Sequence, residues 1–493
     1  MMMKRIAGIA RCVVFLVILA CVLGKINDIL EPNYNFTNAD WPSNSTYDGF
    51  YEMKENSIDV LFLGSSVAAN SFSPLQIYKD YQIRSYNLGS EQQSPFLSYF
   101  WLKEALRYQK PQAVVIDLRF CVNMNAASPI NTLEGLTRKC LDAMHFSPVK
   151  VEAVRTLCKL DPAHSEMSYY LTNLRYHDRW KSLEKSDFNW NEYNKYHLMG
   201  HALSRDIYTG EYYTFDSKDS ESVSNEFHQL SMEYMDKIAL LCKENGIELI
   251  LVNVLGNVMD DGIHNGYTAL AERHGIDYYN FSETGLHNAL AVKHPEESVF
   301  GHASPKGAVK MSQYMGGLLA DVYGVEGIKD EQWEEKLSFY ENALKMHELP
   351  SIDDLESYLA MIPDDDCTVF MAVKEDASAQ MPEGAKAQLK RLGLNTEWNE
   401  DMYRQPYMAI LSPHGNIEGA MGYQAHSSRF EGGRYDVQSI GYQEGNAASI
   451  LINGKEYSLK SRGLNIVVYS HYQDKVIDSV NFDTHVGVDA VRH

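Results

Sequence analysis

From Ile58 onward, short apolar runs alternate with amphipathic stretches along the chain. The apolar runs have the length of buried strands, and the stretches between them have helical spacing. The predicted strands are Asp59–Leu63, Ser85–Leu88, Ala113–Asp117, Glu248–Val254 and Asp277–Phe281. The predicted helices are Pro74–Tyr81, Phe96–Gln109, Phe227–Asn245, Tyr267–His274 and Gly307–Tyr323. This order predicts a three-layer α/β domain over residues 57–325, with a parallel sheet and helices on both faces.

Two stretches depart from this alternation. Residues of about 125–225 are rich in aromatic side chains and histidine, which suggests a mostly helical insertion over one end of the sheet. A charged helical stretch, Glu331–His347, lies in a predicted connector of residues 326–350. Beyond it, residues 351–493 are rich in strand-forming residues and predict a separate α+β domain. Within that domain, Asn453-Gly454 between two apolar runs predicts a tight hairpin, since both residues accept positive φ.

The N-terminus predicts export of the chain. Lys4, Arg5 and Arg11 precede the apolar run Cys12–Gly24, and Lys25 follows it. We expect residues 1–30 to form an uncleaved signal anchor with the positive side in the cytoplasm. The protein would then be a single-pass protein of the cell membrane with its bulk outside.

A cleaved signal peptide and a lipidated Cys21 are the alternatives, and both also export the chain. Residues 31–56 are polar and contain several Asn and two Pro residues, which predicts a stalk. The formal net charge of −22 argues against a nucleic-acid partner, because phosphate binding needs clustered Lys and Arg. The seven cysteines have neither disulfide-framework nor zinc-site spacing, so we expect free thiols and no metal.

Three positions at the predicted carboxyl edge of the sheet can carry chemistry. Ser66 ends the turn after the first strand, Gly89 follows the second strand, and His302 precedes the last helix. A histidine at that edge can take a proton from a serine hydroxyl, which makes the serine a nucleophile. The amides of Ser66 and Gly89 would then stabilise an oxyanion. Such chemistry requires no organic cofactor.

Together these positions resemble the SGNH (GDSL-type) hydrolase family, whose fold is flavodoxin-like. Val60–Ser66 resembles the family's first block, and Tyr86–Gly89 resembles its glycine block. The segment His302–Lys310 resembles its closing histidine block. The resemblance implies an esterase or O-acyltransferase that acts on cell-wall or surface glycans.

Two further segments, Ser85–Gln93 and Tyr176–Trp180, resemble the signature of a membrane-anchored branch of that family in Gram-positive bacteria. A cation beside aromatic rings suits the binding of sugars or carboxylates. The packing of a small core within the insertion is the alternative. The candidate substrate contacts are Asn87, His177, Arg179 and Trp180.

The chain departs from the family pattern at the acid of the triad. Val299 occupies the position of the usual aspartate, and Ser304 that of the usual asparagine. The third oxyanion donor is also not evident, although Asn123 or Asn125 could supply it. If a carboxylate at another position replaces that aspartate, the candidates are Glu296, Glu297, Asp260 and Asp261. An active dyad, a triad with a displaced acid, and a degenerate site that binds without cleaving all remain open.

The C-terminal domain resembles the interleukin-like EMT inducer (ILEI) domain. The resemblance lies in Cys367–Val373, Leu389–Leu394, Ser449–Gly454, Arg462–Tyr469 and Val476–Thr484. It implies a non-catalytic module that binds carbohydrate. We therefore hypothesise a cell-surface enzyme acting on acyl groups of an extracellular glycan. The alternative is a catalytically degenerate surface protein that binds carbohydrate through this module.

Overall fold

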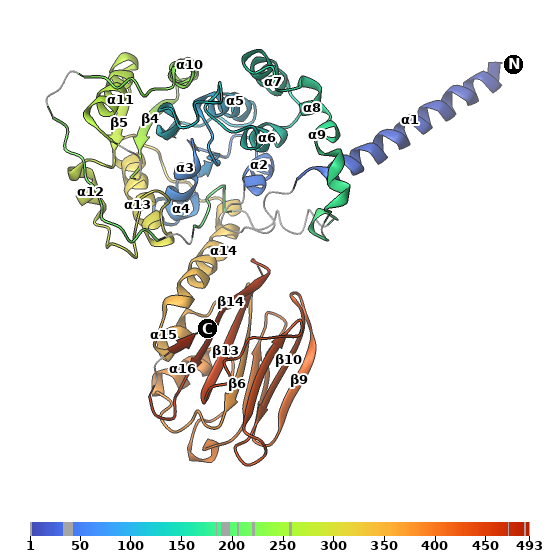
Figure 1. Ribbon diagram of the computed structural model, residues 1–493, viewed down its shortest axis with the longest axis vertical. Coiled ribbons are helices and arrows are strands. Elements are labelled where there is room, and N and C mark those ends of the chain that lie inside the picture. The colour runs from blue at the N-terminus through green and yellow to red at the C-terminus, as the bar shows by residue number, and fades with distance from the viewer. Residues whose placement is uncertain are drawn as a thin grey trace. The chain divides into compact units, whose positions relative to one another are not determined.

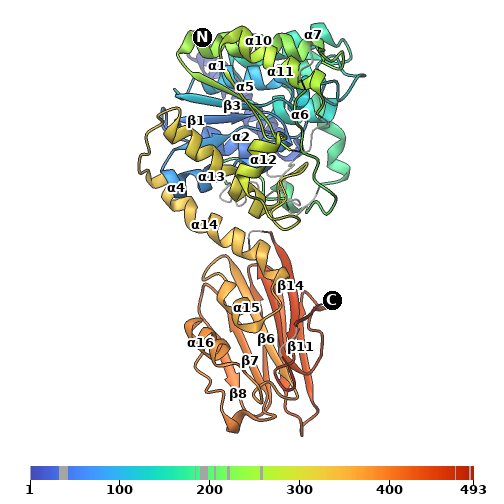
Figure 2. The ribbon, with the colours of Figure 1, turned by 90° about the vertical axis from the view of Figure 1, so that its left-hand side faces the viewer.

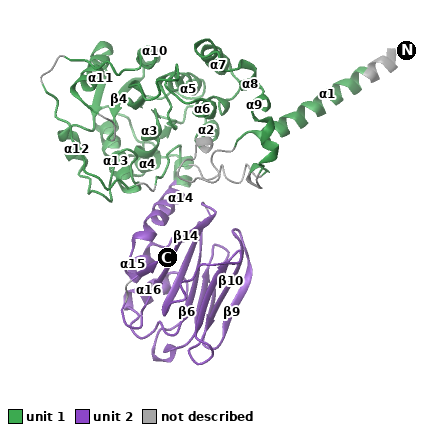
Figure 3. Ribbon diagram, viewed as in Figure 1, with its two compact units in different colours: residues 1–336 green, residues 337–493 purple. Residues whose placement is uncertain are grey.

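The computed structural model describes residues 2–32, 43–183, 185–188, 198–204, 207–218, 222–255, 259–471, 473–487 and 490–492. The chain forms two compact units, Met1–Lys336 and Leu337–His493 (Figure 3).

The first unit contains a parallel sheet of five strands in the order β2-β1-β3-β4-β5. The strands are β1 (Val60–Leu63), β2 (Ser85–Asn87), β3 (Ala113–Asp117), β4 (Glu248–Asn253) and β5 (Asp277–Asn280). Leu61 of β1 lies opposite Tyr86 on one side and Val114 on the other. This strand order is the flavodoxin-like one, so the predicted α/β fold class is confirmed.

Helices cover both faces of this sheet (Figures 1 and 2). One face carries α3 (Ser66–Ser71), α4 (Pro74–Tyr81) and α13 (Pro305–Asp321), which contact one another. The other carries α5 (Pro95–Ala105) and α10 (Gln229–Asn245), with α11 (Asp261–His274) against α10. The apolar positions of the strands explain the arrangement. Phe62 and Val115, for example, pack in one buried cluster with Met311 and Met315 of α13.

The insertion is helical in its first part. It follows η1 (Arg119–Cys121), and its elements are α6 (Glu134–Asp142), α7 (Pro148–Leu160), α8 (Glu166–Tyr170), α9 (Asn173–Tyr176), η2 (His177–Lys181) and η3 (Lys185–Phe188). The described residues from 198 to 218 contain no helix. The segment 198–204 instead turns at Met199–Gly200 and contacts the end of β2, where the N–H of Asn87 donates to the carbonyl of Met199 at 2.9 Å. After β5, α12 (Thr284–Leu290) completes the helices of this domain.

The N-terminal region contains two helices. α1 (Met2–Leu30) includes a stretch, Ile9–Leu30, that is long and apolar enough to cross a membrane. The stalk predicted for residues 31–56 is wrong from Ser43 onward, because α2 (Ser43–Tyr51) packs on the domain. The ring of Tyr47 is buried and stacks on that of Trp101 at 4.3 Å between centroids. The remainder of the predicted stalk, residues 33–42, lies outside the described residues.

The second unit is built from two antiparallel sheets, with the strand orders β15-β14-β13-β6-β7-β8 and β12-β11-β10-β9. The strands are β6 (Cys367–Lys374), β7 (Tyr407–Leu411), β8 (Ile417–Ala420), β9 (Gln424–Phe430), β10 (Gly433–Ile440), β11 (Ala447–Ile452), β12 (Lys455–Glu456), β13 (Gly463–Ser470), β14 (Lys475–Phe482) and β15 (Ala490–Arg492). The helices are α14 (Glu331–Glu348), which begins in the first unit, η6 (Leu349–Ser351), α15 (Leu355–Met361), α16 (Glu383–Arg391) and η7 (Glu400–Met402).

Two apolar clusters hold this unit together. One lies between the six-stranded sheet and the helices α15 and α16, and the other lies between the two sheets. The predicted Asn453-Gly454 hairpin joins β11 to β12, and both residues have positive φ. The strands β8, β9 and β10 escape sequence analysis because they carry few consecutive apolar residues. β9, for example, reads Gln-Ala-His-Ser-Ser-Arg-Phe and is mostly exposed.

Candidate active site

The turn between β1 and α3 presents Ser66 at the carboxyl edge of the sheet. Gly64 has a φ of +125°, and a Cβ there would lie 2.0 Å from Oδ2 of Asp117, so only glycine fits. The Oγ of Ser65 caps α3 by accepting the N–H of Val67 at 3.3 Å. Ser66 is therefore the first residue of the helix, where backbone N–H groups have no partner within the helix.

His302 is held by the loop that leads into α13. Gly301 has a φ of +73°, and its N–H donates to the carbonyl of Leu255 beyond β4 at 3.1 Å. Ser304 caps α13 by accepting the N–H of Gly307 at 3.1 Å. A side chain at Gly307 would collide with the backbone carbonyl of Ser298. The loop is thus fixed on both sides of His302.

These two elements bring Ser66 and His302 together. The Oγ of Ser66 lies 2.9 Å from Nε2 of His302, and both residues are partly exposed. This distance lets the imidazole take the hydroxyl proton as the oxygen attacks a carbonyl carbon. The pair has the geometry of a serine–histidine dyad open to solvent.

Asp117, which sequence analysis did not select, braces the turn before Ser66. It ends β3, is buried, and accepts a short hydrogen bond from the N–H of Ser65. It also accepts the Ser65 hydroxyl at 3.2 Å and the Arg119 N–H at 3.0 Å. Burial raises the pKa of Asp117, while these donors favour its charged form. The available signal was its place as the last residue of a buried strand, at the carboxyl edge of the sheet.

Gly89 lies against the same turn, and Asn87 braces it. An ideal Cβ on Gly89 would stand 3.1 Å from the carbonyl oxygen of Ser65. The N–H of Gly89 donates to Oδ1 of Asn87 at 2.9 Å. The buried amide of Asn87 donates to the carbonyls of Ala68 and Phe72, both at 2.9 Å. Asn87 therefore ties β2 to α3 from within the domain.

The segment 198–204 supports α3 from behind. Nδ1 of His201 lies 2.9 Å from the carbonyl oxygen of Ala69, which can only accept, so Nδ1 carries the proton. Burial lowers the pKa of His201 to about 4, and the ring is neutral at pH 7. Gly200 has a φ of +84°, and a Cβ there would overlap the carbonyl of Asn87. Sequence analysis missed this segment because its residues follow no periodic pattern.

Three of the four candidate acids accept backbone N–H groups elsewhere. Val299, at the position of the aspartate in the family that the sequence resembles, is fully buried in the core. Asp260 caps α11 by accepting the N–H of Ile263 at 2.7 Å. Asp261 accepts the N–H of Lys218 at 2.8 Å, and Glu297 accepts that of Lys293 at 2.7 Å. The N–H of Asn125 donates to the side chain of Asn131 at 2.8 Å.

The contacts of Arg179 are with the end of α1. Its Nη1 donates to the carbonyls of Leu30 and Glu31 at 2.9 and 2.7 Å, and its Nη2 pairs with Asp187 at 2.6 Å. His177 begins the same short helix, η2. The Trp180 side chain is 64% exposed.

Among the described residues, no group of three His, Cys, Asp or Glu side chains is placed to hold a metal ion. No protein-family model matches the chain, and a search of curated proteins found no match. Solved structures to which it is similar include a GDSL-like lipase from Bacteroides thetaiotaomicron. That similarity has 12% identity and a TM-score of 0.26, and it covers 57% of this chain and 98% of the lipase chain.

Proposed function

We propose that this chain is a membrane-anchored serine esterase or O-acyltransferase that acts on acyl groups of an extracytoplasmic glycan. The observation that carries the proposal is the 2.9 Å contact between Ser66 Oγ and His302 Nε2 at the N-terminus of α3. A serine in that place combines an adjacent base with backbone N–H groups that can receive an oxyanion.

The reaction follows from these positions. Ser66 Oγ attacks the ester carbonyl carbon, and its proton moves to Nε2 of His302. The N–H at the start of α3 receives the negative oxygen. The N–H of Gly89 is the predicted second donor, and in this structure it donates to Oδ1 of Asn87. Collapse breaks the ester C–O bond, and His302 protonates the departing alcohol. Water then releases the acyl group, or a second glycan hydroxyl accepts it.

A labelling experiment tests this proposal. A fluorophosphonate probe should label the wild-type protein and Ser65→Ala but not Ser66→Ala. Ser65→Ala is the matched control, since it removes a neighbouring buried hydroxyl that caps α3 and donates to Asp117. Equal labelling of the Ser66→Ala variant would remove Ser66 as the nucleophile. Absence of labelling in the wild type would favour the degenerate, carbohydrate-binding alternative.

For the carbohydrate-binding alternative, the candidate binding site lies on the second unit. A surface groove of about 770 Å³ lies on the β9–β10 hairpin, lined by Phe430, Arg429, Arg434 and Asn453 among others. An aromatic ring beside guanidinium and amide donors suits the binding of a sugar. Arg434→Ala should weaken the binding of bacterial surface glycans on an array, whereas Arg404→Ala should not. Equal binding by both variants would exclude this groove.

A further inference from the structure

Exposed apolar side chains gather where α1 meets the folded domain. They lie on η2, η3, α8 and α9 and in the turns beside them. Their exposed fractions range from 52% to 75%. The group, called the exit patch below, consists of Phe146, Met167, Leu171, Leu174, Trp180 and Phe188. An exposed apolar group of this size marks an interaction surface.

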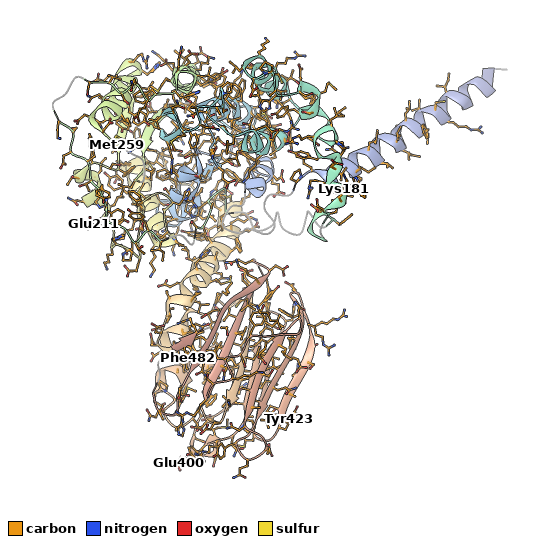
Figure 4. The ribbon with its side chains drawn as sticks, viewed as in Figure 1. Lys181, Glu211, Met259, Glu400, Tyr423 and Phe482 are labelled. Atoms are coloured by element: carbon orange, nitrogen blue, oxygen red, sulfur yellow. The ribbon has the colours of Figure 1, made fainter. Side chains whose placement is uncertain are left out.

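Contacts with α1 place this patch beside the end of the helix. α9, η2 and η3 each contact α1. Phe146 joins them through its ring, which lies 5.8 Å from that of Tyr170 at the end of α8. Figure 1 shows α8 and α9 beside α1, and Figure 4 shows Lys181 next to the end of that helix.

Polar contacts hold α1 firmly in this position. Oδ1 of Asn27 accepts the hydroxyl of Thr172 at 2.7 Å and the N–H of Asn173 at 3.2 Å. Arg179 meanwhile donates to the last carbonyls of the helix, those of Leu30 and Glu31. The direction of α1 is therefore fixed relative to the exit patch.

The length of α1 then determines the depth of the exit patch relative to the bilayer. The 22 residues Ile9–Leu30 extend about 33 Å, close to the thickness of the hydrocarbon core of a bilayer. Thr172 and Arg179 contact residues at the outer end of this stretch, so their neighbours lie at the depth of the lipid headgroups. Trp180 is suited to that depth, and Nζ of Lys181 lies 5.7 Å from its ring centroid.

We infer that the exit patch rests on the outer surface of the bilayer that α1 crosses, with its apolar side chains among the lipid headgroups and upper acyl chains. The inference rests on the proposed anchoring of α1. A surface groove of about 600 Å³ along α7 adjoins Phe146, and its lining includes the charged residues Glu152, Arg155 and Lys159, whose side chains would face the lipid headgroups. The contact would hold the Ser66–His302 edge at a constant height above the membrane. The enzyme would then reach only acyl groups within a defined distance of the lipid surface.

Quenching by brominated lipids tests the inference on the full chain. The protein is reconstituted in vesicles of phosphatidylglycerol and phosphatidylethanolamine, with or without bromine on the acyl chains. Leu174→Trp adds a fluorophore in the patch, and Leu240→Trp adds one on α10, at a leucine that is 51% exposed. The first should lose most of its added fluorescence in brominated vesicles and the second none. Trp180→Phe should reduce the quenching of the parent protein.

Flotation of the vesicles distinguishes a failure of the anchoring by α1 from a failure of the exit patch. Protein that does not float with the vesicles would overturn both the anchoring and the patch. Protein that floats while Leu174→Trp escapes quenching would overturn the patch alone, and would indicate a partner protein or a second copy on this surface. Retained fluorophosphonate labelling at Ser66 shows that each variant is folded.

Discussion

Each unit of this protein pairs a hydroxyl with the Nε2 of a histidine. In the first unit Ser66 lies 2.9 Å from His302, and in the second Thr368 lies 2.8 Å from His471. In the second pair, Glu431 also lies 3.4 Å from Nδ1 of His471. Judged by these distances alone, either histidine could take a proton from its hydroxyl.

The surroundings of the two hydroxyls separate them. Ser66 is partly exposed at the first turn of a helix, where N–H groups can receive an oxyanion. Thr368 is 1% exposed and lies in β6, paired with Tyr469 of β13 in the middle of a sheet. Backbone groups around Thr368 take part in the ladders that join β6 to β13 and, from Val369 onward, to β7. The comparison teaches that access and unpaired amides, more than the hydroxyl–imidazole distance, define the candidate active site.

The largest expected effect comes from the two histidines. His302→Ala should lower kcat/KM for an activated ester on the order of 10⁴-fold, as loss of a triad member does in serine proteases. His471→Ala should leave kcat/KM unchanged and lower the stability of its own unit by about 1 kcal/mol. Steady-state kinetics and thermal unfolding measure the two effects. Similar losses of kcat/KM in both variants would show that the surroundings of the two hydroxyls do not distinguish the two sites.

A second contrast concerns two glycines with positive φ. Gly64→Ala should destabilise the first unit by about 3 kcal/mol and abolish probe labelling, because its Cβ would collide with Asp117. Gly454→Ala, in the β11–β12 hairpin, should cost only about 1 kcal/mol, since nothing lies within 4 Å of its Cβ. Chemical denaturation followed for each unit separately would show this. Equal costs would mean that the turn at Ser66 adapts to a side chain.

The smallest expected effect is a pH dependence of the stability of the first unit. Burial lowers the pKa of His201 from 6.5 to about 4, so the unfolded chain binds its proton first as the pH falls. The contribution of His201 to stability should therefore decline between pH 6.5 and pH 4, on the order of 2 kcal/mol in total. His201→Gln should remove this decline.

The control for that titration is His414→Gln, which changes an exposed histidine of the second unit. The free energy of unfolding of the first unit is measured at pH 7 and pH 4.5 for each variant and for the wild type. An unchanged pH profile in His201→Gln would show that other groups cause the acid sensitivity.

The sequence alone determined the elements whose signals are local. The apolar runs and their helical neighbours predicted the parallel sheet, and Asn453-Gly454 predicted the hairpin, because periodicity and turn chemistry depend on adjacent residues. The chain order of strands and helices also placed Ser66 and His302 at one edge of the sheet. Their separation of 236 positions did not matter, since the carboxyl ends of parallel strands meet at one edge.

Only the tertiary structure decided which residues support that edge. The contacts of Asp117 with Ser65, of His201 with Ala69 and of Arg179 with the end of α1 join segments that no local pattern connects. The burial of α2 in place of a stalk depends in the same way on a distant ring, that of Trp101. The environment that distinguishes Ser66 from Thr368 is likewise a property of the fold. Burial and hydrogen-bond partners arise when distant segments pack, and the order of residues does not show which segments will meet.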